Sequence, residues 1–245
     1  AAPEPARLEL LGRLAAEPGL DVHIVSGRPR NVLEAWLGTL PLTLWAEHGQ
    51  WHRCLRTGEW RGTAELPDGW RDKVHPIIRH FTKATPGSAI ENKSASITWH
   101  YRLADPQFGA RQAHELRMLL GDALSNQPLE VREGKKALEV RLRGVNKGLV
   151  IRHIVASSDA AAPIIAVGDD ETDEDMFTAL SPSMSVGVHI GKERSHAPHR
   201  LEDWRALREW LEMILARRAE MRPSSSAALP CAHAHDSTGP LPRLE

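Results

Sequence analysis

The sequence predicts an α/β protein whose core is a doubly wound parallel sheet and which carries an inserted α+β domain. Three observations predict this fold. Near both ends of the chain, short apolar runs alternate with helical patterns, as they do in βαβ units. Residues 162–170 form an almost continuous apolar run that ends in two aspartates, which is typical of a parallel strand buried on both faces. Between these segments, residues 52–144 have β patterns around a helix, which predicts the α+β insertion.

The first α/β segment begins with a helix and continues with a strand. Apolar residues recur at helical spacing over residues 5–19, and residues 21–27 predict the first strand. The next helix is expected to begin at Pro29 and to end with Gly38 in the C′ position, and residues 42–49 predict the following strand. This order predicts a parallel βαβ unit.

The insertion combines three strand patterns with one helix. Strands are expected at residues 94–102, 129–133 and 136–143, with Gly134 between the last two. Asp105 is expected to cap the helix, with Pro106 at its first position. The apolar positions that predict its buried face are Ala113, Leu116, Leu119 and Leu120.

The second α/β segment repeats the rhythm of the first. It predicts helices at residues 146–158, at residues 172–180 and after Asp203, and strands at residues 162–170 and 184–191. The last residues have no periodicity and are expected to be disordered. The predicted domains are a core at 1–51 and 145–221, the α+β insertion at 52–144, and a disordered tail at 222–245.

Composition excludes some classes of partner. The chain has 31 basic and 32 acidic residues, so its near-zero net charge predicts neither a nucleic-acid partner nor a membrane surface, and a small-molecule partner is expected. No apolar run approaches the roughly 20 residues of a membrane-spanning helix. The two cysteines, Cys54 and Cys231, form no C-x-x-C pair, which favours a reducing, cytoplasmic compartment.

Six carboxylates crowd into residues 169–175, directly after the apolar run. Part of this charge suits a helix N-terminus, where Thr172 and Asp175 resemble a capping box. Asp169 and Asp170 instead stand at the carboxyl end of a parallel strand, where open α/β sheets bind ligands, and a hard cation such as Mg²⁺ would relieve their repulsion. An exposed acidic helix start is the alternative. An EF-hand loop is excluded, because the sixth position is not Gly and the twelfth is not Glu.

Two further features suit a phosphate group. Ser26, Gly27 and Arg28 lead from a strand end into a helix, so a hydroxyl and backbone N–H groups can converge on an anion. Lys147 begins a helix, where a cation is unfavourable unless a negative group lies opposite. Taken singly, these are an ordinary turn and a surface lysine. Together with the acidic pair they predict the electrostatic parts of a phosphoryl-transfer site.

The order of Ser26, Lys147 and the pair Asp169–Asp170 resembles motifs two, three and four of the haloacid dehalogenase superfamily. In a response-regulator receiver the acidic pair comes first, so the order argues against that class. Over about residues 1–215 the chain more narrowly resembles trehalose-6-phosphate phosphatases, including those fused to trehalose-phosphate synthases. The stretches that carry this resemblance are HIVSGRP, AEHG, SASITWHYRLADP, LEVRLRGVNKG and VGDDETDEDMF.

The resemblance implies a haloacid dehalogenase-like core with an α+β cap, and hydrolysis of trehalose 6-phosphate to trehalose and phosphate in trehalose biosynthesis. Ser26, with Gly27 and Arg28, would bind the phosphate, and Lys147 would steady the phosphate and the nucleophile. Asp169 would coordinate Mg²⁺, with Asp170 and Asp173 in support. The sugar would be bound from the cap, although each of these residues alone is an ordinary surface charge: Glu91, Lys93, Arg102, Lys135 and Glu139.

One motif of the family is absent from these 245 residues. The first motif, D-x-D-G-T, supplies the aspartate nucleophile, and the one Asp-Gly pair here, Asp68–Gly69, lies in a turn. We expect the sequence to be truncated just after the nucleophile strand, which would lie between the strands that end at Ser26 and Asp169. The chain as given is then expected to be inactive and poorly folded. The alternative is a non-enzymatic sugar-phosphate-binding or structural domain attached to a synthase.

Overall fold

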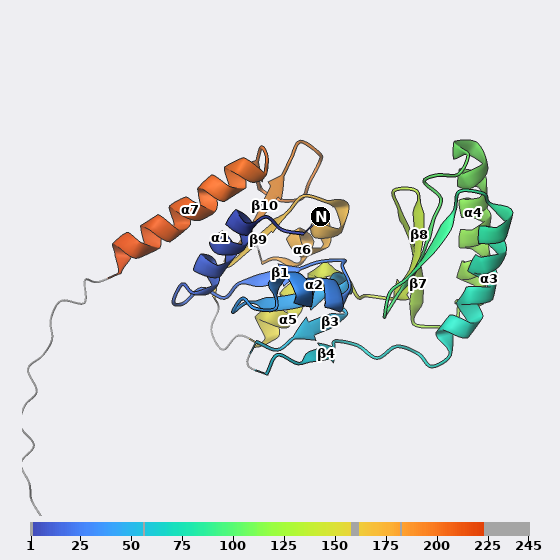
Figure 1. Cartoon of the computed structure of the whole chain (residues 1–245), viewed down its shortest axis with the longest axis horizontal. Helices are drawn as coiled ribbons and strands as arrows, with labels where there is room; N and C mark the ends of the chain where they lie inside the picture. Colours follow the sequence, from blue (N-terminus) through green and yellow to red (C-terminus); the bar gives the residue numbers. More distant parts are fainter. Residues whose placement is uncertain (1, 56, 158–161, 182, 223–245) are drawn as a thin grey trace, which may run out of the picture.

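A computed structural model describes residues 2–55, 57–157, 162–181 and 183–222. It has two parts, a core and a cap, which lie side by side and are joined by two chain segments (Figure 1). Within the described residues, no helix is both long and apolar enough to cross a bilayer. The predicted disordered tail, apart from Arg222, lies outside the described residues.

The first half of the core is a four-stranded sheet with the order β1-β2-β3-β4. β1 and β2 are parallel, as the βαβ pattern predicts, while the two later pairs are antiparallel. Leu33 and Leu37 of α2 are buried with Leu42 and Leu44, so the helix covers the sheet through its apolar face. The elements are α1 (Pro5–Ala15), β1 (His23–Val25), α2 (Arg30–Leu37), β2 (Thr43–Ala46), η1 (Glu47–Gly49), β3 (Trp51–Arg53) and β4 (Trp60–Gly62).

The second half of the core is a parallel three-stranded sheet with the order β11-β10-β9. Among the described residues, β1 and β9 are end strands of their sheets. Ile165 of β9 is 52% exposed, so the strand is not buried on both faces, because an end strand has fewer neighbours to cover it. The elements are α5 (Lys147–Ser157), β9 (Ile164–Gly168), η2 (Glu171–Asp173), α6 (Glu174–Ala179), β10 (Ser185–Ile190), β11 (His199–Leu201) and α7 (Trp204–Met221).

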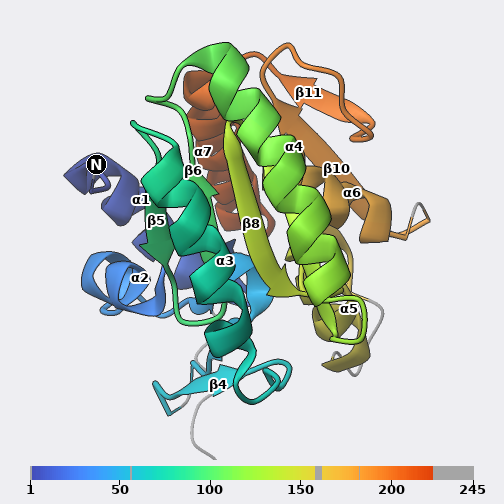
Figure 2. The ribbon, with the colours of Figure 1, turned by 90° about the vertical axis from the view of Figure 1, so that its right-hand side faces the viewer.

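The cap is an antiparallel sheet with the order β5-β6-β8-β7 and two helices on one face (Figure 2). Trp99, Leu138 and Val140 point to that face and are buried with Ile78 and Leu116 of the helices. The other face is turned toward the core (Figure 1). The elements are α3 (Trp70–Ala84), β5 (Ala89–Asn92), β6 (Ile97–His100), α4 (Pro106–Ala123), β7 (Leu129–Gly134) and β8 (Ala137–Leu142).

Side-chain alternation makes the face toward the core polar. Glu91, Thr98, Glu139 and Arg132 are paired in one row across the four strands, so all four side chains lie on this face. The neighbouring residues along each strand point to the opposite, apolar face and form the hydrophobic core of the cap. A one-residue shift in strand pairing would therefore exchange the polar and the apolar face. The register therefore presents charged groups to the core.

The structure differs from the predictions at several elements. β3 and β4 pair with β2 in the core sheet, so the sheet extends past residue 52, where the insertion was expected to begin. α3 was not predicted, although Trp70, Val74 and Ile78 are buried at four-residue spacing, because Pro76 lies inside the helix and discourages the assignment. Gly38 follows α2 but has φ −62°, so it does not end the helix in the left-handed conformation. Leu119, which was predicted on the buried face of its helix, is 51% exposed.

Candidate active site

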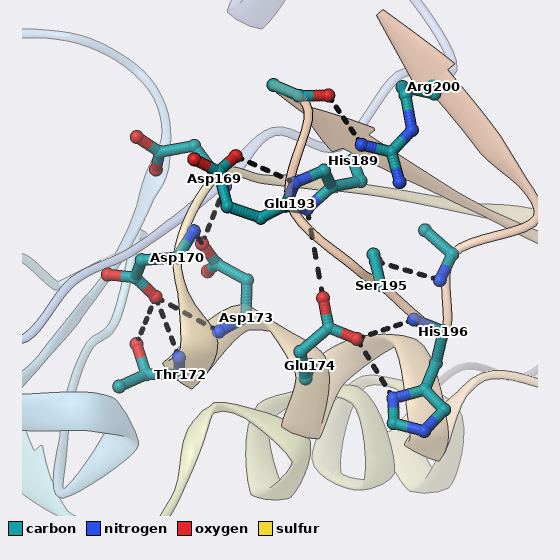
Figure 3. Close-up of polar contacts among 12 residues, drawn as sticks. Asp169, Asp170, Thr172, Asp173, Glu174, His189, Glu193, Ser195, His196 and Arg200 are labelled. Carbon is teal, nitrogen blue, oxygen red and sulfur yellow. Dashed lines mark hydrogen bonds and ion pairs between the residues drawn. The ribbon is translucent and has the colours of Figure 1, made fainter.

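The loop after β9 is organised by the carboxylate of Asp173. Its Oδ2 accepts hydrogen bonds from the backbone N–H groups of Asp169 (2.9 Å) and Asp170 (3.0 Å) (Figure 3). A Cβ at Gly168 would collide with the Asp173 side chain, so the tight approach requires glycine. Asp173 therefore has a structural role in this acidic cluster, because its carboxylate binds the backbone of the turn.

Asp170 is the N-cap of this helix start. Its Oδ1 accepts from the Thr172 backbone N–H (2.9 Å), the Thr172 hydroxyl (2.6 Å) and the Asp173 N–H (3.1 Å). The predicted capping box of Thr172 and Asp175 is wrong: the reciprocal pair is Asp170 and Asp173, because the helix begins two residues earlier with a 3₁₀ turn. Burial opposes ionisation, but the Thr172 hydroxyl and the Lys147 charge outweigh it and lower the pKa of Asp170.

Lys147, at the start of α5, is 6% exposed and supplies the positive charge for this loop. Its Nζ lies 2.7 Å from Asp173 Oδ1 and 3.5 Å from Asp170 Oδ1. Asp173 is itself 4% exposed, and this burial raises the pKa of its carboxyl even though Lys147 opposes the shift. The lysine is therefore no solvated surface residue, since it forms a buried ion pair with a fixed carboxylate.

The three aspartates fit a divalent cation in part. One oxygen from each of Asp169, Asp170 and Asp173 lies within 4.8 Å of the others, and carboxylate oxygens are the donors that Mg²⁺ prefers. Both oxygens of Asp173 already accept hydrogen bonds, whereas Asp169 is exposed and Asp170 uses Oδ1 alone in the contacts above. Asp169 and the second oxygen of Asp170 are therefore the donors least engaged in other contacts, and Asp173 Oδ1 keeps one lone pair beside its bond to Lys147.

A layer of histidines and glutamates lies beside this loop (Figure 3). Glu174 accepts hydrogen bonds from the His196 backbone N–H (2.7 Å) and lies 3.0 Å from the His196 ring, so it ties the chain after β10 to the acidic loop. His189 is buried, and among the described residues neither of its ring nitrogens has a hydrogen-bond partner. The carboxylates of Glu174 and Glu193 flank that ring at 3.7 and 3.8 Å.

The predicted phosphate loop follows β1 on the same core. Ser26 Oγ accepts from the Arg28 N–H at 3.2 Å, which holds the hydroxyl beside the start of α2. A Cβ at Gly27 would lie 2.5 Å from the His48 ring, so glycine is required here for close approach. The guanidinium of Arg28 lies over the Trp36 ring, 4.6 Å from its centre.

On the cap, three predicted sugar-binding residues lie on the polar face or at its edge. Lys93 Nζ lies 3.5 Å from Glu139 Oε1, which also accepts from the Ser96 hydroxyl at 2.8 Å. Burial opposes ionisation of Glu139, but Lys93 and this hydroxyl outweigh it and lower the pKa of Glu139. Glu91 pairs with the His100 ring at 2.8 Å.

The other two predicted cap residues lie apart from this group. Arg102 follows β6 and Lys135 lies in the turn between β7 and β8, and both are exposed. In the part of the chain that the structure describes, no hydrogen bond or ion pair joins either side chain to Glu91, Lys93 or Glu139. Their predicted contact with the sugar stays a prediction.

His48 was not among the predicted site residues, although it lies between the phosphate and sugar sides. Burial lowers its pKa to about 4, with Glu139 opposing the shift and Lys93 and Lys147 adding to it. The ring is therefore neutral at pH 7, and its Nδ1 is buried with no hydrogen-bond partner among the described residues. The sequence signal was the AEHG stretch, which resembles the family but does not reveal which way the ring points.

The loops that follow β1 and β9 carry the serine and the acidic pair, and a polar sheet face lies across from them on an inserted cap. This arrangement is the fold of haloacid dehalogenase-like hydrolases, since a solved structure of that description from Bacteroides thetaiotaomicron matches with TM-score 0.67 at 16% identity, covering 86% of the chain and 92% of that structure. The chain belongs to the trehalose-phosphatase family, whose model matches residues 1–207.

Three comparisons illustrate this membership. The chain is 42% identical over 193 residues to a protein named alpha,alpha-trehalose-phosphate synthase [UDP-forming] B from Dictyostelium discoideum, covering 77% of the chain and 24% of that relative. It is 38% identical over 216 residues to the trehalose-phosphatase of Schizosaccharomyces pombe, covering 83% and 26%. The solved C-terminal domain of Candida albicans trehalose-6-phosphate phosphatase matches with TM-score 0.76 and 31% identity, covering 88% of the chain and 85% of that domain. The chain thus spans about a quarter of the length of these curated relatives.

Proposed function

We propose that this chain is the phosphatase region of a Mg²⁺-dependent enzyme that hydrolyses trehalose 6-phosphate to trehalose and inorganic phosphate. The observation that carries the proposal is the buried Lys147–Asp173 ion pair, which lies beside Asp169 and Asp170. These residues fall within the segment that matches the trehalose-phosphatase family. A lysine and a cation there would neutralise a bound phosphate monoester.

Each residue has a separate role in this proposal. Asp169 and the outer oxygen of Asp170 would hold Mg²⁺, which supplies charge neutralisation at the phosphate when bound. Asp173 would fix Lys147 and the loop backbone, and its Oδ1, which accepts from Lys147 alone in these contacts, would keep a lone pair to support the metal site. Ser26, Gly27 and Arg28 would bind the phosphate, and Glu91, Lys93, Arg102, Lys135 and Glu139 would bind the sugar.

The nucleophile stays a prediction. The family's chemistry needs a carboxylate in a D-x-D-G-T motif, which these 245 residues do not contain. We propose that such a carboxylate enters the site between the ends of β1 and β9. The non-enzymatic alternative gains no support from the comparisons, since the relatives named above include a trehalose-phosphatase.

The experiment is a steady-state phosphate-release assay on the full-length protein with Mg²⁺. Trehalose 6-phosphate, glucose 6-phosphate and sucrose 6-phosphate are compared at matched concentrations. We expect the highest kcat/KM with trehalose 6-phosphate, and loss of activity when Mg²⁺ is chelated. Equal rates on all three esters would contradict the proposed substrate.

Two further assignments stay proposals. A trehalose-phosphate synthase domain in the same polypeptide would match the name of the Dictyostelium relative, of which this chain covers 24%. A cytoplasmic location stays a prediction from the sequence.

A further inference from the structure

Glu47, at the end of β2, is a buried core carboxylate that binds the cap. It is 5% exposed. Its Oε1 accepts from the Ser94 hydroxyl (2.6 Å) and lies 3.4 Å from the Ser94 N–H, and its Oε2 accepts from the Ala95 N–H (2.8 Å). Both oxygens are therefore used, which offsets the cost of burying the charge.

The backbone around Glu47 is held in an unfavourable conformation. Glu47 and His48 have φ of 49° and 60°, and Gly49 follows at 100°, so three consecutive residues are left-handed. A non-glycine residue persists in this region only when its surroundings impose the conformation. The imposed turn directs the Glu47 side chain out of the core and toward the cap.

The phosphate loop supplies part of that constraint. The Glu47 N–H donates to the Arg28 carbonyl at 3.1 Å, and the His48 N–H donates to the Ser26 carbonyl at 3.0 Å. Glu47 and His48 are therefore hydrogen-bonded to the predicted phosphate-binding loop through their backbone, while the Glu47 side chain is bonded to the cap.

The cap loop that is hydrogen-bonded to Glu47 also carries Lys93. Arg71 donates to the carbonyls of Lys93 (2.6 Å) and Ser94 (2.8 Å), so the loop is fixed from the cap side as well. Trp51 of β3 donates to the Ser94 hydroxyl at 2.7 Å. Among the described residues, four hydrogen bonds thus run from Glu47 and Trp51 to this loop. Lys93 directly precedes Ser94, and its ammonium group lies 3.5 Å from Glu139 on the polar face.

We propose that Glu47 is a positioning residue that couples the phosphate loop of the core to the sugar-binding loop of the cap. It touches neither the phosphate nor the sugar in this role. It sets where Lys93 stands relative to Ser26, so affinity for the sugar depends on it while handling of the phosphate does not. This inference rests on the proposed function.

The test uses steady-state kinetics of the full-length protein and its Glu47→Gln variant. Gln keeps the size of the side chain but removes the charge and one acceptor oxygen. We expect KM for trehalose 6-phosphate to rise about tenfold, while kcat/KM for p-nitrophenyl phosphate, which lacks the sugar, stays within about twofold. Glu65→Gln, an exposed glutamate between core and cap, is the matched control and is expected to change neither value.

Equal losses on both substrates, or an unchanged KM, would overturn the inference. If Glu47→Gln does not fold, Ser94→Ala tests the same contact from the cap side, with an expected KM increase of about threefold and no change for p-nitrophenyl phosphate. If both variants fold, the KM increase of the double variant should be smaller than the product of the two single increases. The reason is that Glu47→Gln and Ser94→Ala break the same interaction. A parent protein with no activity on trehalose 6-phosphate would instead contradict the proposed function.

Discussion

The core loops proposed to bind phosphate and the cap face proposed to bind sugar hold their charged groups in different ways. On the core, Lys147 and Asp173 are buried and paired, and the surrounding carboxylate oxygens accept backbone hydrogen bonds. On the cap, Glu91 and its partner His100 are more open, and Arg102 and Lys135 are exposed. A phosphate has fixed charge and shape, which suits a rigid set of groups, whereas a sugar offers many hydroxyls to an adaptable polar face.

From this difference we expect that substitutions on the two sides can be separated by their effects. Buried pairs cannot lose one member without leaving an uncompensated charge, so core substitutions should be severe and independent of the sugar. Substitutions at the exposed cap positions Glu91, Arg102 and Lys135 leave polar neighbours that water can satisfy. They should be mild and visible only with the natural substrate.

The largest expected effect comes from the nucleophile. Residues 1–245 alone are expected to release no phosphate from trehalose 6-phosphate, because the chain contains no D-x-D-G-T motif. The full-length protein is expected to release it under the same conditions with Mg²⁺. A malachite-green assay measures both. Turnover by residues 1–245 would show that the nucleophile has been misplaced.

Asp169→Asn should have the next largest effect. Removing a cation ligand should lower kcat about 10²–10³-fold on trehalose 6-phosphate and on p-nitrophenyl phosphate alike. It should also abolish the rise in melting temperature that Mg²⁺ causes. Glu171→Gln is the control from the same acidic cluster, since Glu171 is exposed. A Mg²⁺ shift that survives in Asp169→Asn would remove Asp169 from the metal site.

Lys147→Met should destabilise the core even without substrate. The substitution keeps the length of the side chain but leaves the buried Asp173 carboxylate without its cation, which costs about 3–5 kcal/mol in free energy of unfolding. Urea denaturation measures the change, and Lys192→Met at an exposed position is the control. A loss below about 1 kcal/mol would mean that the pair is not buried in solution.

His48 should make stability depend on pH. Its pKa is lowered to about 4 in the folded protein from an ordinary 6.5, so between these values the unfolded chain binds more protons. The free energy of unfolding should therefore be highest above pH 6.5 and fall by about 3 kcal/mol as the pH drops to 4. His48→Asn should lose that part of the slope in urea titrations across this range. Parallel curves for parent and variant would contradict it.

Much of the fold was predictable from the sequence where its signals are local. The helix N-cap at Asp105 and the strand before Asp169 follow from residue type and periodicity, and both are present. The family resemblance placed Ser26, Lys147 and the acidic pair in one site. The capping partners in the acidic cluster were not predictable, because a 3₁₀ turn shifts the helix start by two residues.

The role of Glu47 and His48 could not be inferred from local pattern. The hydrogen bonds of Glu47 join the core to cap residues 47 and 48 positions away in the sequence, and the left-handed backbone of both residues contradicts the preference of non-glycine residues. The same limit applies to β3 and β4, since three-residue strands give too short an alternation to show which sheet they join.

The smallest predicted effect gives the most direct test of the division between core and cap. In the full-length protein, kcat/KM is measured for trehalose 6-phosphate and for p-nitrophenyl phosphate with Glu139→Ala, and with Glu133→Ala as the exposed control on the same hairpin. We expect Glu139→Ala to lower the ratio of the two values about tenfold through KM for trehalose 6-phosphate, with no change for the aryl ester. Equal losses on both substrates would contradict a separate sugar site on the cap.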